Sequence, residues 1–217
     1  MALNINGTTG ISGVDGSVSA PAVTGTDSNT GITFPSADTI KFSTGGVERI
    51  SITNSGISGT GISAGGKFSS YALIKDTKGN TTDGGTFTSG AWRTRDLNAE
   101  ISDEDGIVSI SSNQFTLAAG NYLIKFQAPA LKVEFHQARL RNNTDGINYS
   151  GTSEYSGSGD VVQTVSFGVA RVAITGSKAF EIQHRSTATK TTDGFGQPSY
   201  GFGDESIYTL VEIFKES

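Results

Sequence analysis

The clearest hydrophobic pattern of the chain lies in residues 121–128, where apolar and polar side chains alternate. A period of two residues is that of a β-strand with one buried face, because successive side chains point to opposite sides of a sheet. The apolar face carries Tyr122, Ile124, Phe126 and Ala128, and the polar face carries Lys125 and Gln127. We therefore expect a strand here whose apolar face belongs to a hydrophobic core.

Shorter apolar runs recur through residues 67–217, separated by Gly, Asn, Thr and Pro clusters that indicate turns. The expected strand regions are 71–74, 87–97, 107–110, 115–117, 121–128, 133–140, 161–174, 180–184 and 207–214. About eight strands at this spacing predict a β-sandwich or jelly roll. The last strand is apolar on both faces, which indicates a central strand or one whose outer face meets another subunit.

One of these regions shows a change of phase. Val133 and Phe135 continue the alternation of the preceding strand, whereas Ala138 and Leu140 fall on the opposite face. An extra residue in one strand, a β-bulge, produces such a change. The pattern predicts a bulge near residues 136–137.

Residues 1–66 have a different pattern, since half of them are Gly, Ser or Thr and few apolar side chains remain for a core. Two short runs flank a turn signal at Gly45 and Gly46, as in a β-hairpin. The apolar positions here are Ile40, Phe42, Val47, Ile50, Ile52, Ile57 and Ile62. A lone hairpin is marginal in water, so burial of these side chains between three chains explains the pattern better than a monomer does. We expect residues 31–66 to form a trimeric β stalk.

Residues 1–30 are more irregular, with single apolar side chains between Gly-rich turns. Such a segment either orders on a partner or frays as a terminus, and the composition of residues 1–66 as a whole is also that of a disordered linker. The ordered apolar pattern favours a functional division. We expect an anchoring segment at residues 1–30, the stalk at 31–66 and a jelly-roll head domain at 67–217.

Charge and composition narrow the functional classes. The chain of 217 residues has a net charge of -5 and scattered Lys and Arg, whereas nucleic-acid binding needs clustered cations. It contains no Cys, which removes disulfides, thiolate metal sites and cysteine nucleophiles. It shows neither an export signal nor the roughly 18 apolar residues of a membrane span. We expect synthesis in a cytoplasm, no membrane insertion and no nucleic-acid partner.

Candidate catalytic and metal-binding residues are few. The two histidines, His136 and His184, lie in expected strands without a local ligand or base motif, and we interpret them as structural. The carboxylates of residues 96–105 lack EF-hand spacing, so a solvated loop is the simpler interpretation and a calcium site at a trimer axis the alternative. Neither a serine nucleophile elbow nor a carboxylate pair is recognisable. We predict no enzyme activity and no cofactor.

Several aromatic residues lie in or beside Gly/Ser-rich loops, namely Trp92, Tyr149, Tyr155, Phe195 and Tyr200. Aromatic rings in loops stack on sugar rings or anchor protein contacts, although packing within or between subunits is the simpler interpretation. The best candidate for ligand recognition is the loop of residues 195–202. Its aromatic side chains are Phe195, Tyr200 and Phe202.

Three stretches of the head carry a resemblance when they are taken together. They are residues 90–95 (GAWRTR), 119–126 (AGNYLIKF) and 203–214 (GDESIYTLVEIF). In this order they resemble the second strand region, the Gly-x-Tyr strand and the closing strand of complement-component globular heads, which belong to the tumour necrosis factor-like superfamily. The resemblance covers about residues 67–217 and implies a trimeric jelly roll. No collagen-like Gly-x-y repeat precedes the head here, unlike in the complement group.

Two stretches of the N-terminal region resemble a second group. Residues 1–13 (MALNINGTTGISG) and 39–52 (TIKFSTGGVERISI) are similar to N-terminal and stalk segments of bacteriophage fibre proteins, particularly those of phages of aquatic bacteria. In such fibres a Phe-x-x-Gly-Gly-x-Glu-Arg-Ile-x-Ile hairpin leads into a distal domain. The resemblance implies a virion protein.

Together these features predict a short homotrimeric fibre or spike of a bacteriophage virion, attached to another virion protein through residues 1–30. The head is expected to bind a host-surface glycan or protein, with avidity from several copies. A capsid-attached head fibre or decoration protein is an alternative to a tail fibre, and the docking partner distinguishes them. In a different class, a free secreted lectin-like protein predicts an export signal and a dispensable N-terminus.

Overall fold

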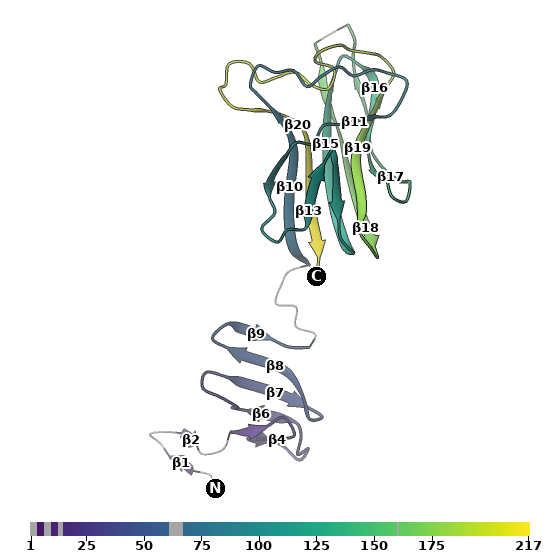
Figure 1. The fold of residues 1–217 in the computed structure, drawn as a ribbon. Helices are drawn as coiled ribbons and strands as arrows, with labels where there is room; N and C mark the ends of the chain where they lie inside the picture. The colour runs from purple at the N-terminus through teal and green to yellow at the C-terminus, as the bar shows by residue number, and fades with distance from the viewer. Residues whose placement is uncertain (1–3, 7–9, 13–14, 61–66, 160) are drawn as a thin grey trace. The chain divides into compact units, whose positions relative to one another are not determined.

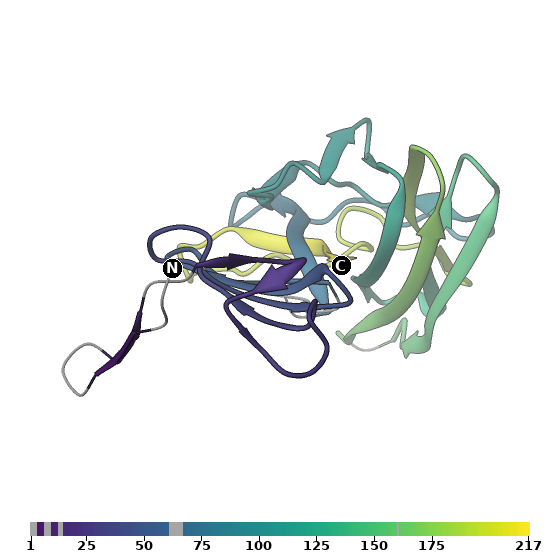
Figure 2. The ribbon, with the colours of Figure 1, turned by 90° about the horizontal axis from the view of Figure 1, so that it is seen from below.

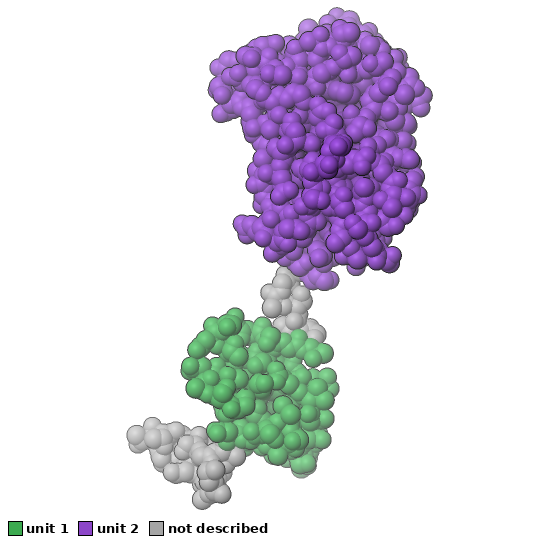
Figure 3. Space-filling model, viewed as in Figure 1, with its two compact units in different colours: residues 1–66 green, residues 67–217 purple. Residues whose placement is uncertain are grey.

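The structure is a computed structural model that describes residues 4–6, 10–12, 15–60, 67–159 and 161–217 (Figure 1). The chain divides into two compact units, Met1–Gly66 and Lys67–Ser217 (Figure 3). Every secondary-structure element assigned to the described residues is a β-strand, which confirms the predicted all-β class. The described residues accordingly contain no helix suited to crossing a membrane.

The N-terminal unit is built from short antiparallel strands. In two small hairpins, β1 (Asn4–Asn6) pairs with β2 (Gly10–Ser12) and β3 (Gly16–Ser17) pairs with β4 (Ala20–Pro21). A five-stranded sheet follows in chain order, formed by β5 (Val23–Thr24), β6 (Gly31–Thr33), β7 (Ile40–Thr44), β8 (Val47–Thr53) and β9 (Gly56–Ser58). Each of these five strands pairs only with its neighbours in the sequence, so the sheet is a meander.

The hairpin between β7 and β8 turns at Gly45 and Gly46, as predicted. The two glycines have φ angles of 59° and 72°, the left-handed backbone that a type I′ turn requires at both central positions. A side chain at either position disfavours that backbone. The Gly-Gly pair therefore fixes the pairing of Thr44 with Val47, and a register shift between Phe42 and Ser43 then places Ile40 opposite Ile52.

The head is a sandwich of two antiparallel sheets (Figures 1 and 2). The five-stranded head sheet has the order β12 (Ala99–Ser102), β10 (Phe68–Lys78), β20 (Ser206–Glu216), β15 (Gly120–Leu131) and β18 (Gln163–Ile174). The six-stranded head sheet has the order β13 (Val108–Ser111), β14 (Gln114–Leu117), β19 (Lys178–Ser186), β16 (Glu134–Asn142) and β17 (Ile147–Ser156), with β11 (Arg93–Thr94) paired to β19. Several strands that follow one another in sequence, such as β15 and β16, lie in opposite sheets, whereas the hairpins β13–β14 and β16–β17 each stay within one sheet. The predicted jelly roll is confirmed.

The hydrophobic core of the head lies between its two sheets. The predicted apolar face of β15 is buried there at Tyr122, Ile124, Phe126 and Ala128. The six-stranded sheet supplies Phe115, Leu117, Leu140, Phe180 and Ile182 to the same cluster. Gly168 of β18 makes room for this packing, because a Cβ atom at that position would lie 2.1 Å from the ring of Phe126.

The change of phase predicted at residues 136–137 has a different origin. Val133 is buried and Phe135 is exposed because the chain turns between the two sheets here, and the residues on either side of Val133 have φ angles of 56° and 62°. From Phe135 onward β16 alternates regularly. A register shift does occur in the β16–β17 ladder between Gln137 and Arg139, where the additional residue lies in β17.

Of two other predicted strand regions, one is mostly loop and the other is the long strand that its pattern allowed. Residues 87–97 contain only the two-residue strand β11, and most of this region is loop. Residues 161–174 form one continuous strand, β18, from Gln163. The closing strand β20 lies between β10 and β15 near the middle of its sheet, which accounts for the apolar residues on both of its faces.

Candidate binding surfaces

One face of the five-stranded N-terminal sheet carries two apolar cross-strand rows. The first row joins Val23, Ile32, Phe42 and Ile50, and the second joins Ile40, Ile52 and Ile57. We call these side chains the stalk face. Each of them keeps contact with water in the single chain, and Ile57 is 53% exposed. A sheet of one layer leaves such a face in water unless another chain covers it.

The opposite face holds most of what this unit buries. Among residues 15–60 the buried positions are Pro21, Thr33, Ser43 and Ser51. Three of these four carry hydroxyl groups. Lys41 and Glu48 form an ion pair of 2.6 Å on this side, and a pair so accessible to solvent contributes less than about 1 kcal/mol. The described part of this unit therefore lacks a hydrophobic core of its own.

The predicted trimer contacts of the stalk fall mostly on the stalk face. Five of them belong to it, namely Ile40, Phe42, Ile50, Ile52 and Ile57. Val47 pairs with Thr44 beside the hairpin turn and is half exposed. Ile62 lies outside the described residues, as do parts of the predicted anchoring segment 1–30.

The head has an exposed apolar stripe along β18, at the edge of the five-stranded head sheet. Val165, Phe167 and Val169 point outward and alternate with the buried Ser166 and Ala170. We call these three outward residues the β18 stripe. A strand that is apolar on its outer side is unusual for a surface in water and indicates a contact surface.

The predicted recognition loop is divided between the interior and the surface. Phe195 packs inward against Phe87, with ring centroids 4.5 Å apart, and under the guanidinium of Arg95 at 4.2 Å. Tyr200 and Phe202 lie on the surface, 56% and 80% exposed. Within this loop only the latter two rings are free to meet a large ligand.

Arg95 holds the loop in place from inside the head. Its side chain is 1% exposed and donates hydrogen bonds to the hydroxyl of Thr209 (3.0 Å) and to the carbonyls of Pro129 (3.1 Å) and Phe195 (2.9 Å). Burial lowers the pKa of Arg95 to about 10, against the opposing effect of Asp76 and Asp96. The guanidinium therefore stays charged at neutral pH and joins three distant segments.

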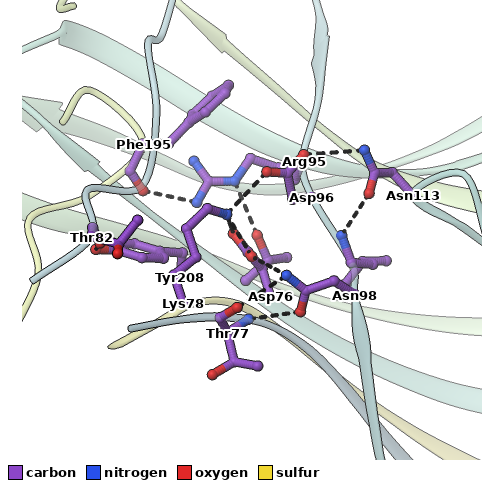
Figure 4. A network of polar contacts seen from close by, with 12 residues as sticks. Asp76, Thr77, Lys78, Thr82, Arg95, Asp96, Asn98, Asn113, Phe195 and Tyr208 are labelled. Atoms are coloured by element: carbon purple, nitrogen blue, oxygen red, sulfur yellow. Dashed lines mark hydrogen bonds and ion pairs between the residues drawn. The ribbon is translucent and has the colours of Figure 1, made fainter. Parts of the chain in front are cut away.

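A polar network continues from Arg95 to the surface (Figure 4). Lys78 contacts the carboxylate of Asp76 at 2.7 Å and that of Asp96 at 3.0 Å. Asn98 donates to the Asp76 carboxylate at 3.1 Å, and Asn113 donates to Asp96 at the same distance. Asp76 is almost fully buried, so these partners replace the water that its charge loses. The network is a structural support for β10 and the loop before β12.

The two histidines form a buried pair. Nδ1 of His136 lies 2.9 Å from Nε2 of His184, and Nε2 of His136 lies 2.8 Å from the hydroxyl of Thr164. Burial and the charge of Arg95 hold the pKa of His184 well below its ordinary 6.5, and burial lowers the pKa of His136 to about 4 despite the opposing charge of Glu154. Nδ1 of His184 has no hydrogen-bond partner among the described residues. Both rings are neutral at pH 7. The proton of His184 lies on Nε2, because this tautomer donates to Nδ1 of His136 and leaves only the lone pair on Nδ1 of His184 without a partner among the described residues.

The acidic residues 96–105 are dispersed in the structure. Asp96 joins the network around Lys78, and Asp103 accepts hydrogen bonds from the backbone N–H groups of Ile107 (2.8 Å) and Val108 (2.9 Å). Glu104 and Asp105 are exposed. Within the described residues no His, Cys, Asp and Glu side chains are grouped as a metal site.

Three features escaped the sequence analysis. The partners of Arg95 lie 34, 100 and 114 residues away in the chain, and the histidines lie 48 residues apart. The outer face of the six-stranded head sheet also joins aromatic and basic residues of several strands. The only local signal was the opposite phase of Phe135 and Ala138, which places Phe135 outside.

Sequence comparison gives no match to a family model or to a curated protein. The fold is similar to those of several solved structures. They include the globular domain of zebrafish complement 1qA protein (16% identity, 69% of this chain and 96% of that chain, TM-score 0.42), PRD1 vertex protein P5 (12%, 70% and 100%, 0.45) and Eiger TNF from S. frugiperda (12%, 68% and 92%, 0.46). At these identities the likeness concerns the fold and not the function.

Proposed function

We propose that this chain is a structural subunit of a bacteriophage virion, a short homotrimeric fibre or spike. Residues 1–30 attach it to another virion protein, residues 31–66 form the trimeric stalk, and residues 67–217 present the head for host-surface attachment. Its role is mechanical and adhesive, and not catalytic. The observation that carries the proposal is the stalk face, an uncovered apolar surface on a unit without a core of its own.

Association through the stalk face follows from the cost of leaving it in water. Complete burial of an exposed Val, Ile or Phe side chain stabilises a protein by about 1.5–3 kcal/mol, so each of these partly exposed side chains gains at most on the order of 1 kcal/mol on association. Association costs on the order of 10 kcal/mol in lost motion. The seven side chains of one chain, held in register by the sheet, do not offset this cost alone, and it is outweighed only when several chains contribute. Three copies around one axis cover every copy of the face, and the resemblance of the head to trimeric jelly rolls favours three over a face-to-face pair.

The β18 stripe supports a second contact between heads. Val165, Phe167 and Val169 each keep roughly two fifths to half of their surface in water. On the neighbouring strands of the same face, Phe214 of β20 packs against Tyr71 at 4.9 Å and under Lys125 at 5.0 Å. The outer side of this sheet therefore carries exposed apolar side chains along β18 and aromatic rings on β10 and β20.

The virion location rests on the resemblance of residues 1–13 and 39–52 to fibre segments. A tail position and a capsid position differ in the protein that receives residues 1–30. An electron-microscopy map of the intact particle that contains these residues distinguishes the two. Density for the chain inside the capsid shell, away from any surface projection, would contradict a fibre.

The trimer is tested by the mass of the full chain in solution. We expect light scattering after size exclusion to give three times the 22.5 kDa chain mass. Ile57→Asp should lower that mass, because it places a charge on the stalk face. Ser58→Asp is the matched control, since Ser58 is the next residue of β9, equally exposed, and points to the opposite face. A monomeric full chain, or equal masses for both variants, would contradict the proposal.

A further inference from the structure

The outer face of the six-stranded head sheet contains a groove of about 280 Å³. Its walls come from the loop before β11, from β16, β17 and β19, and include Trp92, Phe135, Gln137, Ser153 and Arg185. The groove lies on the sheet opposite to the one that carries the β18 stripe. The proposed contact between heads therefore leaves it open to solvent.

Aromatic rings line two sides of the groove. Phe135 is 66% exposed and packs against Tyr155, with ring centroids 5.0 Å apart and planes tilted by 59°. On another side the guanidinium of Arg139 lies 3.9 Å from the ring of Trp92 and donates two hydrogen bonds to Oε1 of Gln183. These contacts hold both aromatic surfaces in fixed orientations before any ligand binds. Such preorganised rings lose little freedom on binding.

Polar groups stand between the aromatic walls. Gln137 donates to the carbonyl of Gly151 at 2.8 Å, which fixes its amide and leaves Oε1 as an acceptor. Ser153 lies beside it across the ladder and is exposed. Arg185 also pairs with Gln137 in register, and its side chain is exposed and makes no hydrogen bond or ion pair with the described residues. The groove thus offers ring surfaces, an acceptor, a hydroxyl and one uncommitted cation. It is also lined by the carboxylate of Glu154, which accepts a hydrogen bond from the hydroxyl of Thr152 at 2.8 Å.

We propose that this groove binds an acidic saccharide, with a pyranose ring against Phe135 and Trp92 and its carboxylate on Arg185. The inference rests on the proposed function, because it names the ligand class of the head. The C–H faces of a sugar pack on aromatic rings while its hydroxyls need donors and acceptors at the edges, and this groove supplies both. A planar guanidinium binds a carboxylate through two parallel hydrogen bonds.

Charge argues against a second copy of this chain as the occupant. A symmetric contact would bring Arg185 and Arg139 of one copy toward the same arginines of the other, and like charges across a contact disfavour it. The broad apolar surfaces of the molecule lie elsewhere, on the stalk face and the β18 stripe. An anionic ligand with apolar ring faces fits this groove better than either.

The test is saturation-transfer NMR on the full chain with methyl glucuronide, methyl galacturonide and N-acetylneuraminic acid, against the neutral methyl glucoside. We expect saturable binding of at least one acidic sugar and weaker binding of the neutral one. Phe135→Ala and Arg185→Gln should each weaken binding by on the order of tenfold, the size expected for one stacking contact or one charged hydrogen-bonded pair. Both side chains are exposed, so both variants are expected to fold.

Matched controls lie outside the groove. Phe34→Ala removes an exposed aromatic ring and Arg49→Gln removes an exposed arginine, both in the N-terminal unit. Neither should change binding. Absence of saturable binding for all three acidic sugars would overturn the inference. Binding by Phe135→Ala and Arg185→Gln as tight as that of the unaltered chain, or loss of binding only in Phe34→Ala, would overturn it as well. A trimer that binds no sugar contradicts this inference alone, whereas a monomer that binds through the groove contradicts the proposed fibre alone.

Discussion

The two units treat the same kind of residue in opposite ways. In the head, Phe126 of β15 is almost completely buried between two sheets. In the N-terminal unit, Phe42 of β7 stands in an apolar row whose outer side meets water. Both come from alternating strands, so local pattern alone does not separate them. What separates them is whether the chain itself supplies a second layer.

This contrast teaches where each unit obtains its stability. The head encloses a core of residues from both sheets, and a sandwich of this size is stable as one chain. The N-terminal sheet has local pairing and one uncovered face, and needs a partner to gain the free energy that a second layer gives. The unfolding of the N-terminal unit should therefore depend on protein concentration more strongly than the unfolding of the head.

The largest effect is expected from Phe126→Ala in the head. Removal of a buried phenylalanine costs about 3–5 kcal/mol of the free energy of unfolding. Gly168 packs directly against the ring of Phe126 and has no side chain to fill the cavity that the substitution leaves. Denaturant unfolding followed by near-ultraviolet circular dichroism measures it. The mass of the assembly at native pH should stay the same. A cost below about 1 kcal/mol would show that the head core is looser than its burial indicates.

The second effect concerns Arg95, which joins the recognition loop to the sandwich. Arg95→Ala leaves two buried carbonyls and the hydroxyl of Thr209 without their donor, at a cost on the order of 3 kcal/mol. The loop of residues 187–203 should also become susceptible to proteolysis. Arg93→Ala is the control, because Arg93 is exposed and makes one hydrogen bond, to the carbonyl of Thr88. Equal proteolysis in both variants would contradict the role of Arg95.

The sequence predicted what depends on local periodicity. The alternation around Phe126 identified the core face of β15, and Gly45 with Gly46 identified the hairpin turn. The jelly roll followed from the number and spacing of strands. Each of these depends on residues a few positions apart, where the period of a strand and the φ angles of glycine decide the structure.

The sequence did not predict what depends on register between distant strands. Arginine is rarely buried, and the donors of Arg95 meet acceptors that only the folded sandwich brings together. His136 and His184 become partners because β16 and β19 pair with Ala138 opposite His184. Phe135 and Arg185 line one groove for the same reason. Pairings between strands 48 residues apart have no local signature.

The third prediction sharpens the contrast directly. Phe42→Ala removes the same ring as Phe126→Ala, but from the stalk face. We expect association to weaken by about 1 kcal/mol per chain, since Phe42 is already partly buried in the single chain and only its remaining exposed surface is available for burial between chains. The unfolding of the head should not change. Light scattering over a dilution series measures the association, and a dissociation midpoint equal to that of the unaltered chain would contradict the assigned role.

The fourth prediction concerns pH, and it separates the units because both histidines belong to the head. Their pKa values are lowered in the folded protein, to about 4 for His136 and well below 6.5 for His184. Above pH 6.5 the two histidines bind no additional proton in either the folded or the unfolded chain. Between pH 6.5 and about 4 the unfolded chain is protonated and the folded head is not, so stability falls as pH falls. The slope is about 1.4 kcal/mol per pH unit for each histidine that remains neutral in the folded state.

Carboxylates act in a lower pH range and do not obscure this effect. Hydrogen bonds and ion pairs lower the pKa values of Asp145, Glu205 and Glu216 below their ordinary 3.8 and 4.5, so the stability they contribute is lost only below about pH 4.5. Unfolding midpoints at pH 7, 6 and 5 therefore report the histidines. His184→Gln, whose amide can still donate toward Nδ1 of His136, should reduce the slope by about half. If the slope of stability against pH persists in His184→Gln, the acid sensitivity belongs to groups outside the histidine pair. If the N-terminal unit dissociates over the same pH range, the contrast between the two units is removed.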